Sequence, residues 1–120
     1  MFIKNHLPLI KRFLFFLKSQ PLIDRFLQDQ LKRATVSISA NIAKGSGRFT
    51  LADKRHFYVI SRGSAFESFS ILQILSDLYL SEKNECENLK KSIEEITRML
   101  FGLIKNINQK IPLRLALETY

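Results

Sequence analysis

The fold class is decided by residues 89–107, LKKSIEEITRMLFGLIKNI. Apolar residues recur there at alternate spacings of four and three, which predicts an amphipathic helix with one heptad seam. That seam comprises Leu89, Ile93, Ile96, Leu100, Leu103 and Ile107. A helix with a single apolar stripe needs partners to cover it, so we expect other helices to pack around this one.

The other residues of the 120-residue chain also favour long helices. Only four Gly and three Pro occur, which favours a few long elements with short connections. We therefore expect an all-α chain in which residues 1–120 form one antiparallel up-down-up-down four-helix bundle. The expected helices span about 5–18, 23–44, 51–80 and 82–109, and the expected tail spans 111–120.

The first expected helix is apolar around more than half of its circumference. Proline is tolerated in the first helical turn, so Pro8 places the start near residue 5. One apolar row can face the bundle. The second row, Leu9, Phe13 and Phe16, then needs another partner, and we expect a neighbouring subunit to cover it. Because the apolar run is only five residues long, we expect no membrane span.

The second helix carries an ambiguous segment. Residues 35–39 alternate polar and apolar side chains, which is a strand pattern. The helical period of residues 27–34 continues into it without a turn residue, so we expect a helix with the seam Leu27, Leu31, Ala34, Ile38, Asn41 and Ile42. Gly45 is the expected C-cap.

The third helix is expected to begin after Thr50, an N-cap residue. Its expected seam is Phe57, Ile60, Ser64, Glu67, Ile71, Ile74 and Leu78, and Leu72, Leu75 and Tyr79 are expected to extend that face. Glu67 is unusual in this seam, because a buried carboxylate needs a partner or a proton. We expect it to pair with an arginine such as Arg33, Arg48 or Arg62, and not to be catalytic.

Charge is distributed unevenly along the chain, whose net charge is +8. Residues 1–62 carry twelve basic and three acidic groups, and residues 63–100 carry four and seven. Such asymmetry indicates an anionic partner, either nucleic acid or an acidic membrane surface, although a basic surface can also serve solubility alone. The residues expected to contact phosphates are Lys32, Arg33, Lys44, Arg48, Lys54 and Arg55.

Motifs for catalysis or cofactor binding are not apparent in the sequence. His6 and His56 stand alone, so we expect no metal site and no cofactor. The Gly45–Ser46–Gly47 turn lacks the spacing and ending of a phosphate-binding P-loop. We expect a non-enzymatic protein. The single cysteine, Cys86, favours a reducing cytoplasmic compartment.

Two blocks resemble a known family. They are residues 30–48, QLKRATVSISANIAKGSGR, and residues 62–67, RGSAFE, which follow Phe57. Both are similar to the four-helix-bundle proteins encoded by intervening sequences of bacterial large-subunit ribosomal RNA genes. That family is related to the accessory protein of diversity-generating retroelements. The resemblance spans roughly residues 21–107 and supports a helix through residues 34–43.

The resemblance implies an antiparallel bundle that assembles into a ring-shaped homopentamer. The retroelement relative binds nucleic acid and a reverse transcriptase, and RNA binding is the usual proposal for the ribosomal-insert family. The resemblance also implies a structural polar network of Asn41, Arg62, Ser64 and Glu67. At Lys44 the family usually has Glu, so this chain gains positive charge beside Arg48.

Two function hypotheses follow. The leading one is a non-enzymatic, RNA-binding homo-oligomer that contacts phosphates through its basic surface. The alternative is a protein-interaction scaffold that docks a partner on the Phe-rich first helix.

Overall fold

The computed structural model describes residues 2–18, 24–78 and 83–111, with side chains from residue 7 onward. These residues form helices and turns and contain no strand, which confirms the all-α prediction. The expected tail lies, from residue 112 onward, outside the described residues. The four helices are α1 (Phe2–Lys18), α2 (Arg25–Ser46), α3 (Leu51–Leu78) and α4 (Lys83–Asn108).

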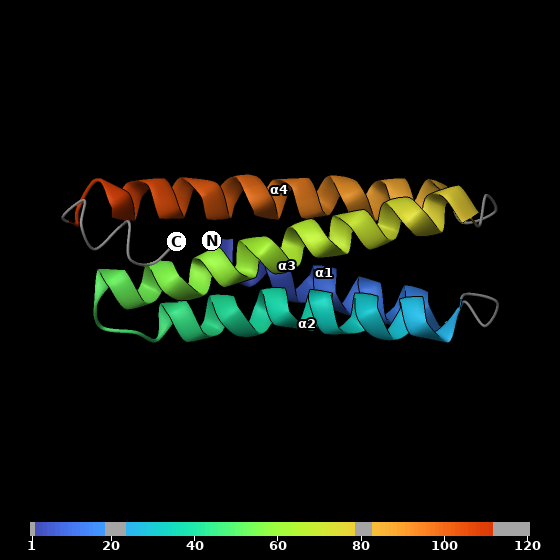
Figure 1. Cartoon of the computed structure of the whole chain (residues 1–120), viewed down its shortest axis with the longest axis horizontal. Helices are drawn as coiled ribbons and strands as arrows, with labels where there is room; N and C mark the ends of the chain where they lie inside the picture. The colour runs from blue at the N-terminus through green and yellow to red at the C-terminus, as the bar shows by residue number, and fades with distance from the viewer. Residues whose placement is uncertain (1, 19–23, 79–82, 112–120) are drawn as a thin grey trace.

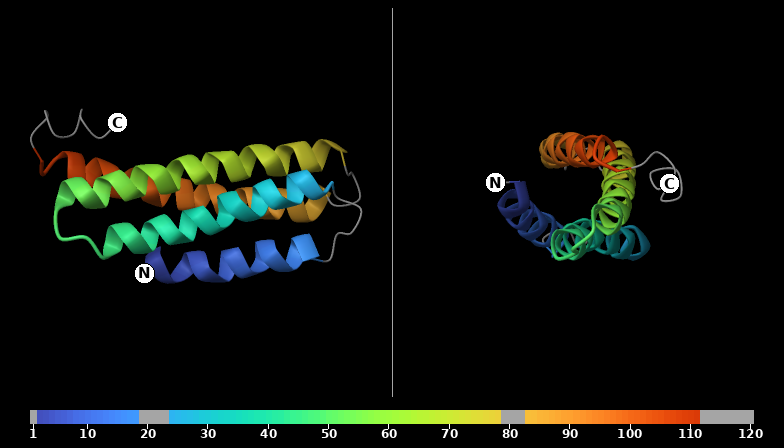
Figure 2. Two further views of the ribbon diagram at one scale, coloured as in Figure 1. Left: turned by 60° about the horizontal axis from the view of Figure 1, so that its bottom comes forward. Right: turned by 90° about the vertical axis from the view of Figure 1, so that its left-hand side faces the viewer.

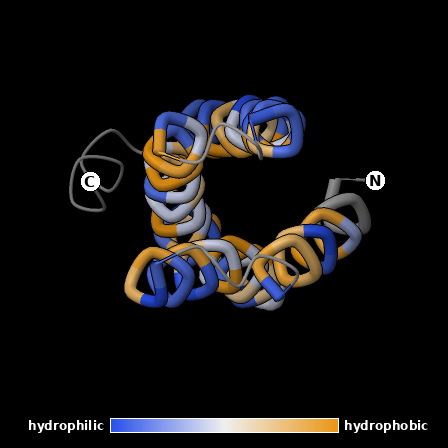
Figure 3. Tube along the Cα trace, turned by 90° about the vertical axis from the view of Figure 1, so that its right-hand side faces the viewer, coloured by the Kyte–Doolittle hydropathy of each residue, from blue (hydrophilic) through white to orange (hydrophobic). Residues whose placement is uncertain are grey.

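Consecutive helices run in opposite directions along one elongated bundle (Figure 1). The end views show the helices following one another around the bundle in chain order (Figures 2 and 3). Packing is most extensive between α2 and α3 and between α3 and α4, whereas α1 packs on α2 and less extensively on α4. The two central helices therefore form the best-packed part of the molecule.

Side-chain oxygens cap the starts of the two central helices. Asp24 accepts hydrogen bonds from the backbone N–H groups of Phe26 at 2.8 Å and Leu27 at 3.3 Å. Thr50 Oγ1 accepts from the N–H of Asp53 at 3.2 Å, as expected of an N-cap. These bonds satisfy amide groups that have no partner within the helix, and so they fix where α2 and α3 begin.

Gly45 lies inside α2 and does not cap it, contrary to the expectation. The helix continues through Ser46, and Gly47 donates its N–H to the Ala43 carbonyl at 3.1 Å. Gly45 is needed for close packing, because a Cβ there would lie 2.7 Å from Cε1 of Tyr58. The Tyr58 hydroxyl also lies 3.2 Å from Ser46 Oγ, which holds the ring against the end of α2.

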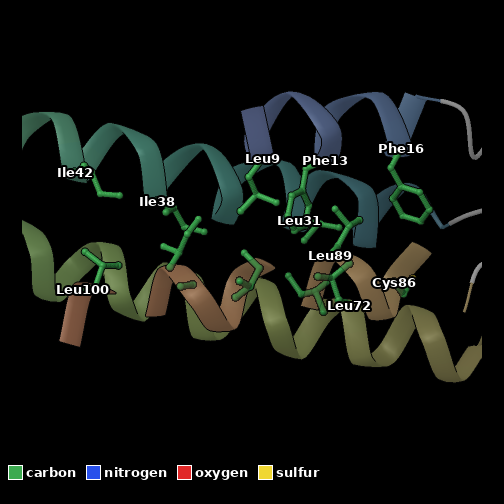
Figure 4. Packing of buried hydrophobic residues seen from close by; sticks show 14 of the residues in the cluster. Leu9, Phe13, Phe16, Leu31, Ile38, Ile42, Leu72, Cys86, Leu89 and Leu100 are labelled. Carbon is green, nitrogen blue, oxygen red and sulfur yellow. The ribbon is translucent and has the colours of Figure 1, made fainter. Parts of the chain in front are cut away.

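The core is built from apolar side chains of all four helices (Figure 4). Leu31, Ile38 and Ile42 of α2 are fully buried, as the predicted seam requires. In α4, the predicted seam residues are buried except Leu103, which is partly exposed, and Ile104 is buried beside it. The prediction of an amphipathic α4 is therefore confirmed.

The expected subunit interface on α1 is part of this core. Leu9, Phe13 and Phe16 are 5%, 0% and 4% exposed and point toward α2 and α4 (Figure 4). The prediction that a neighbouring subunit covers these three side chains is wrong, because the core of the same chain already buries them. From residue 7 to residue 18, the large apolar side chains that α1 exposes are Leu7, Leu14 and Phe15. All three residues of the row that was predicted to face outward therefore face inward.

Helix α1 also starts earlier than Pro8 predicts. It begins at Phe2, so Pro8 lies within the helix and not in its first turn. Proline has no N–H, so the helical hydrogen bond that residue 8 would donate is missing. The proline ring also lies against the carbonyl of the preceding turn, and the buried residues that follow Pro8 stabilise the remainder of α1.

The buried face of α3 differs from the predicted seam. Ser64 and Ile71 are buried as expected, but Ile60, Ile74 and Leu78 are exposed. Leu72 and Leu75 are buried as well, and Tyr79 lies outside the described residues. The residues that α3 buries are Arg55, Tyr58, Ser61, Ser64, Ala65, Ser68, Ile71, Leu72, Leu75 and Ser76. Many of these side chains are small hydroxyls, and they are satisfied internally. Ser61 Oγ donates to the Ile38 carbonyl at 2.9 Å, which ties α3 closely to α2.

One lysine of α4 is buried among partners from two helices. Lys90 Nζ lies 2.7 Å from Oε1 of Glu87 and donates to Oε1 of Gln73 at 2.6 Å. The ammonium also lies 5.5 Å from the ring centre of Phe69. The hydrogen bond from Lys90 lowers the pKa of Glu87 below its ordinary value. These contacts compensate the removal of a charge from water and link α3 to α4.

Candidate nucleic-acid interface

The outer face of α2 forms a shallow hollow of about 490 Å³. Three of the predicted phosphate-binding residues, Lys32, Arg33 and Lys44, line it together, and all three are exposed. The remaining lining residues are Val36, Ser37, Ala40 and Asn41. Small side chains at the centre with long cations around them leave room for an anionic group to approach the helix.

Hydrogen bonds hold the floor of this hollow in place. Ser37 Oγ and Ser64 Oγ are 2.7 Å apart, which joins α2 to α3. Asn41 Nδ2 donates to the Ser37 carbonyl at 2.8 Å and to Ser37 Oγ at 3.0 Å. Two members of the implied polar network, Asn41 and Ser64, are therefore brought together, with Ser37 as the residue between them.

Glu67 lies outside this network. Its side chain is exposed on α3, and it forms no ion pair with a described arginine. The expectation of a buried, paired carboxylate is therefore wrong, because the inward face of α3 is rotated away from Glu67. Arg62 is partly buried and joins neither Asn41 nor Ser64 by a hydrogen bond in the described part of the chain.

The three basic residues around the α2–α3 turn have different environments. Arg48 is exposed, and its guanidinium carbon lies 4.7 Å from the ring centre of Phe57. Lys54 is half-buried, and its Nζ donates to the carbonyls of Ser46 at 3.1 Å and Gly45 at 3.4 Å. This lysine thus caps the C-terminal end of α2, where carbonyl groups lack helical partners.

Arg55 is fully buried, contrary to the expectation of an exposed phosphate contact. Its Nε donates a hydrogen bond to Oδ1 of Asn108 near the end of α4. Neighbouring residues on a helix point about 100° apart, so consecutive basic residues do not share one face. Arg55 therefore contributes to the packing of α3 on α4 and is removed from the candidate interface.

Positive charge is concentrated at the end of the bundle that holds the α2–α3 turn and the C-terminus of α4 (Figure 1). Residues 44–57 carry four basic groups and one acidic group, and residues 105–111 add Lys105 and Lys110. We call this the basic end. The opposite end carries five basic and five acidic residues, counted over residues 12–18, 24–30, 72–78 and 83–90.

Sequence reasoning missed several residues of this surface. Val36 and Ala40 belong to the hollow because they lie one and two turns after Lys32 on the helix, a spacing that was readable from the sequence. Lys105 and Lys110 join the basic end only through the antiparallel path of α4, so tertiary structure was needed to find them.

The described residues contain no cluster of metal-ligating side chains, since no three of their His, Cys, Asp and Glu residues are grouped so that they could hold a metal ion. None of the described helices combines the length and apolar character that a membrane span requires.

Comparison with known proteins relates the fold to a family. The family described as 23S rRNA-intervening sequence protein matches residues 13–102. A solved structure of a protein of unknown function from the S23 ribosomal protein family of Bacteroides thetaiotaomicron VPI-5482 is 21% identical, with a TM-score of 0.83. The match covers 88% of this chain and 99% of that one, and it shows a shared fold. No curated protein matches the chain. The family match extends over most of the chain, which therefore belongs to the 23S rRNA-intervening sequence protein family.

Proposed function

We propose that this protein is a non-enzymatic nucleic-acid-binding protein of the bacterial cytoplasm, with RNA as its ligand. The observation that carries the proposal is the convergence of Lys32, Arg33 and Lys44 on one hollow of α2. Arg48 continues this positive surface toward the basic end. Membership of a family defined by ribosomal RNA intervening sequences supports RNA over other anions.

The mechanism is contact with phosphates and not readout of bases by hydrogen bonds. Each lysine or arginine that neutralises a phosphate releases condensed counterions, so affinity depends on salt concentration. The small residues between the cations, Val36 and Ala40, allow a phosphate backbone to lie close to the helix. The hydrogen bond between Ser37 and Ser64 and the one that Asn41 donates to Ser37 keep the floor rigid, which limits the entropy lost on binding.

A filter-binding titration with a structured RNA fragment tests this function. Four phosphate contacts per chain predict that log K falls with log salt with a slope of about −3 or steeper. The measurement is repeated over a series of salt concentrations with the wild-type chain. Absence of binding at low salt, or an affinity that does not respond to salt, contradicts the proposal.

We also propose that the protein acts as a homopentamer, in which repetition of a modest basic patch raises the overall affinity. Large apolar side chains remain exposed on the described helices, as a subunit contact would require. They include Phe66, Ile74, Leu78 and Phe101. Sedimentation is expected to give a particle of five times the 14.0 kDa chain mass. A particle with the mass of one chain contradicts this part of the proposal.

A further inference from the structure

The α2–α3 turn presents one aromatic side chain entirely to solvent. Phe49 is 101% exposed, and it lies between the end of α2 and the Thr50 cap of α3. Both neighbouring helix ends are fixed, by the Gly47 hydrogen bond to Ala43 and by the Thr50 hydrogen bond from Asp53. The fold therefore holds the backbone on both sides of a phenylalanine that makes no contribution to the core.

Other planar groups lie in the same region. The Arg48 guanidinium stacks on the Phe57 ring at 4.7 Å, and the His56 ring meets the Phe57 ring edge-on with centroids 5.1 Å apart. Arg48 and His56 are exposed, whereas Phe57 is partly buried and anchors them both. A guanidinium held on a ring is pre-oriented, so little entropy is lost when a ligand contacts it.

The charge around Phe49 indicates what kind of molecule contacts it. The exposed cations of the basic end are Lys44, Arg48, Lys105 and Lys110, and Asp53 is the one acidic residue in residues 44–57. A second copy that docked through this same end would bring two positive surfaces together, which is unfavourable. An anionic ligand that also offers flat apolar faces fits both the charge and the exposed ring.

We infer that Phe49, with Arg48 and His56, binds unpaired bases of a single-stranded RNA segment. Bases of a single strand are free to stack on aromatic rings and guanidinium planes, whereas bases inside a duplex are not. Lys44 and Arg48 neutralise the adjoining phosphates. This inference rests on the proposed function and specifies its ligand as an RNA that contains an unpaired segment.

Phe49→Ala tests the inference, and Phe26→Ala is the matched control. Phe26 is also exposed, at 67%, but lies in the first turn of α2 at the opposite end. Binding is measured with an unstructured oligouridine and with a fully paired RNA duplex of equal length. Phe49→Ala is expected to weaken oligouridine binding about tenfold. The salt slope and duplex affinity are expected to stay unchanged, and Phe26→Ala is expected to change neither affinity.

A fluorescence measurement gives an independent reading. The chain contains no tryptophan, so Phe49→Trp introduces a single reporter at the turn. Stacking of a base on this ring is expected to quench its fluorescence when oligouridine is added, and Phe26→Trp is expected to show no quenching. Equal quenching by the duplex, or no quenching at saturating oligouridine, overturns the inference.

The outcomes separate the inference from the function on which it rests. If the wild-type chain binds both RNAs with steep salt dependence and Phe49→Ala binds like Phe26→Ala, only the base-stacking inference fails. If the wild-type chain binds no RNA at low salt, the proposed function fails and the inference fails with it. If Phe49→Ala lowers the sedimentation mass of the RNA-free protein, Phe49 belongs to a subunit contact and the inference is overturned.

Discussion

Replacing Lys32, Arg33 and Lys44 together by glutamate is expected to weaken RNA binding by about a hundredfold at physiological salt. These three side chains line one hollow, so their replacement removes three phosphate contacts and adds repulsion at the same place. All three are exposed on α2, and none of them contributes to the buried core. The helical circular dichroism spectrum is therefore expected to remain that of the wild type.

The matched control places the same change of charge on α4. Lys83, Lys91 and Arg98 are exposed, and their replacement by glutamate alters the net charge equally. Because exposed charges more than about 8 Å apart are screened at physiological salt, this variant is expected to bind only a few fold more weakly. Equal losses in the two variants contradict the placement of the interface on α2, since they show a response to net charge alone.

Phe13→Ala is expected to destabilise the folded chain by about 3–5 kcal/mol. The Phe13 side chain is 0% exposed and points into the core with Leu9 and Leu31 (Figure 4). Its removal leaves a cavity at the contact of α1 with the rest of the bundle. Because small domains are stable by only about 5–15 kcal/mol, such a loss is readily measured by urea denaturation.

Phe15→Ala is the control for this prediction. Phe15 lies two residues away on the same helix but is 76% exposed, so its replacement is expected to change stability by less than about 0.5 kcal/mol. Equal effects of the two replacements contradict the orientation of α1. If the Phe13→Ala chain keeps the stability of the wild type but forms a particle of lower mass, Phe13 belongs to a subunit interface, as the sequence alone predicts.

The helical period made α2 and α4 predictable. In α4 the apolar residues form one stripe, so only one face can turn inward. The strand-like pattern of residues 35–39 was misleading because its polar residues are satisfied within a helical bundle. Thr35 Oγ1 donates to the Leu31 carbonyl at 2.8 Å, and Ser37 bonds to Ser64 on α3. The first bond lies within α2, whereas the second depends on tertiary packing and is not visible in a local pattern.

The orientations of α1 and α3 could not be predicted in the same way. Helix α1 has two apolar rows of similar strength, and packing against α2 decides which row faces inward. On α3 the buried face is rich in serine, whereas isoleucines such as Ile60 and Ile74 lie outside. Hydrophobicity alone therefore does not decide which face of α3 turns inward, and hydrogen bonds such as Ser61 to Ile38 stabilise the observed orientation.

The candidate site was predicted only in part for the same reason. Arg33 and Lys44 share one stripe of α2 by helical spacing, and the structure places both of them, together with Lys32, around one hollow. Arg55 was assigned to the surface because it clusters in sequence with Arg48 and Lys54 around the turn, yet it is buried and donates a hydrogen bond to Asn108. Phe49 could have been noticed as a large apolar residue in a tight turn, but its full exposure became evident only with the fold.

The assignment of phosphate binding to α2 is tested by the dependence of RNA affinity on salt concentration. This salt slope is compared between the wild-type chain and the variant that carries Lys32→Glu, Arg33→Glu and Lys44→Glu. The slope counts the phosphates that the protein neutralises, so it reports contacts and not overall stability or folding. Loss of three contacts is expected to make the slope shallower by at least about 2. An unchanged slope, with or without a loss of affinity, contradicts the claim that these residues of α2 bind the phosphates of RNA.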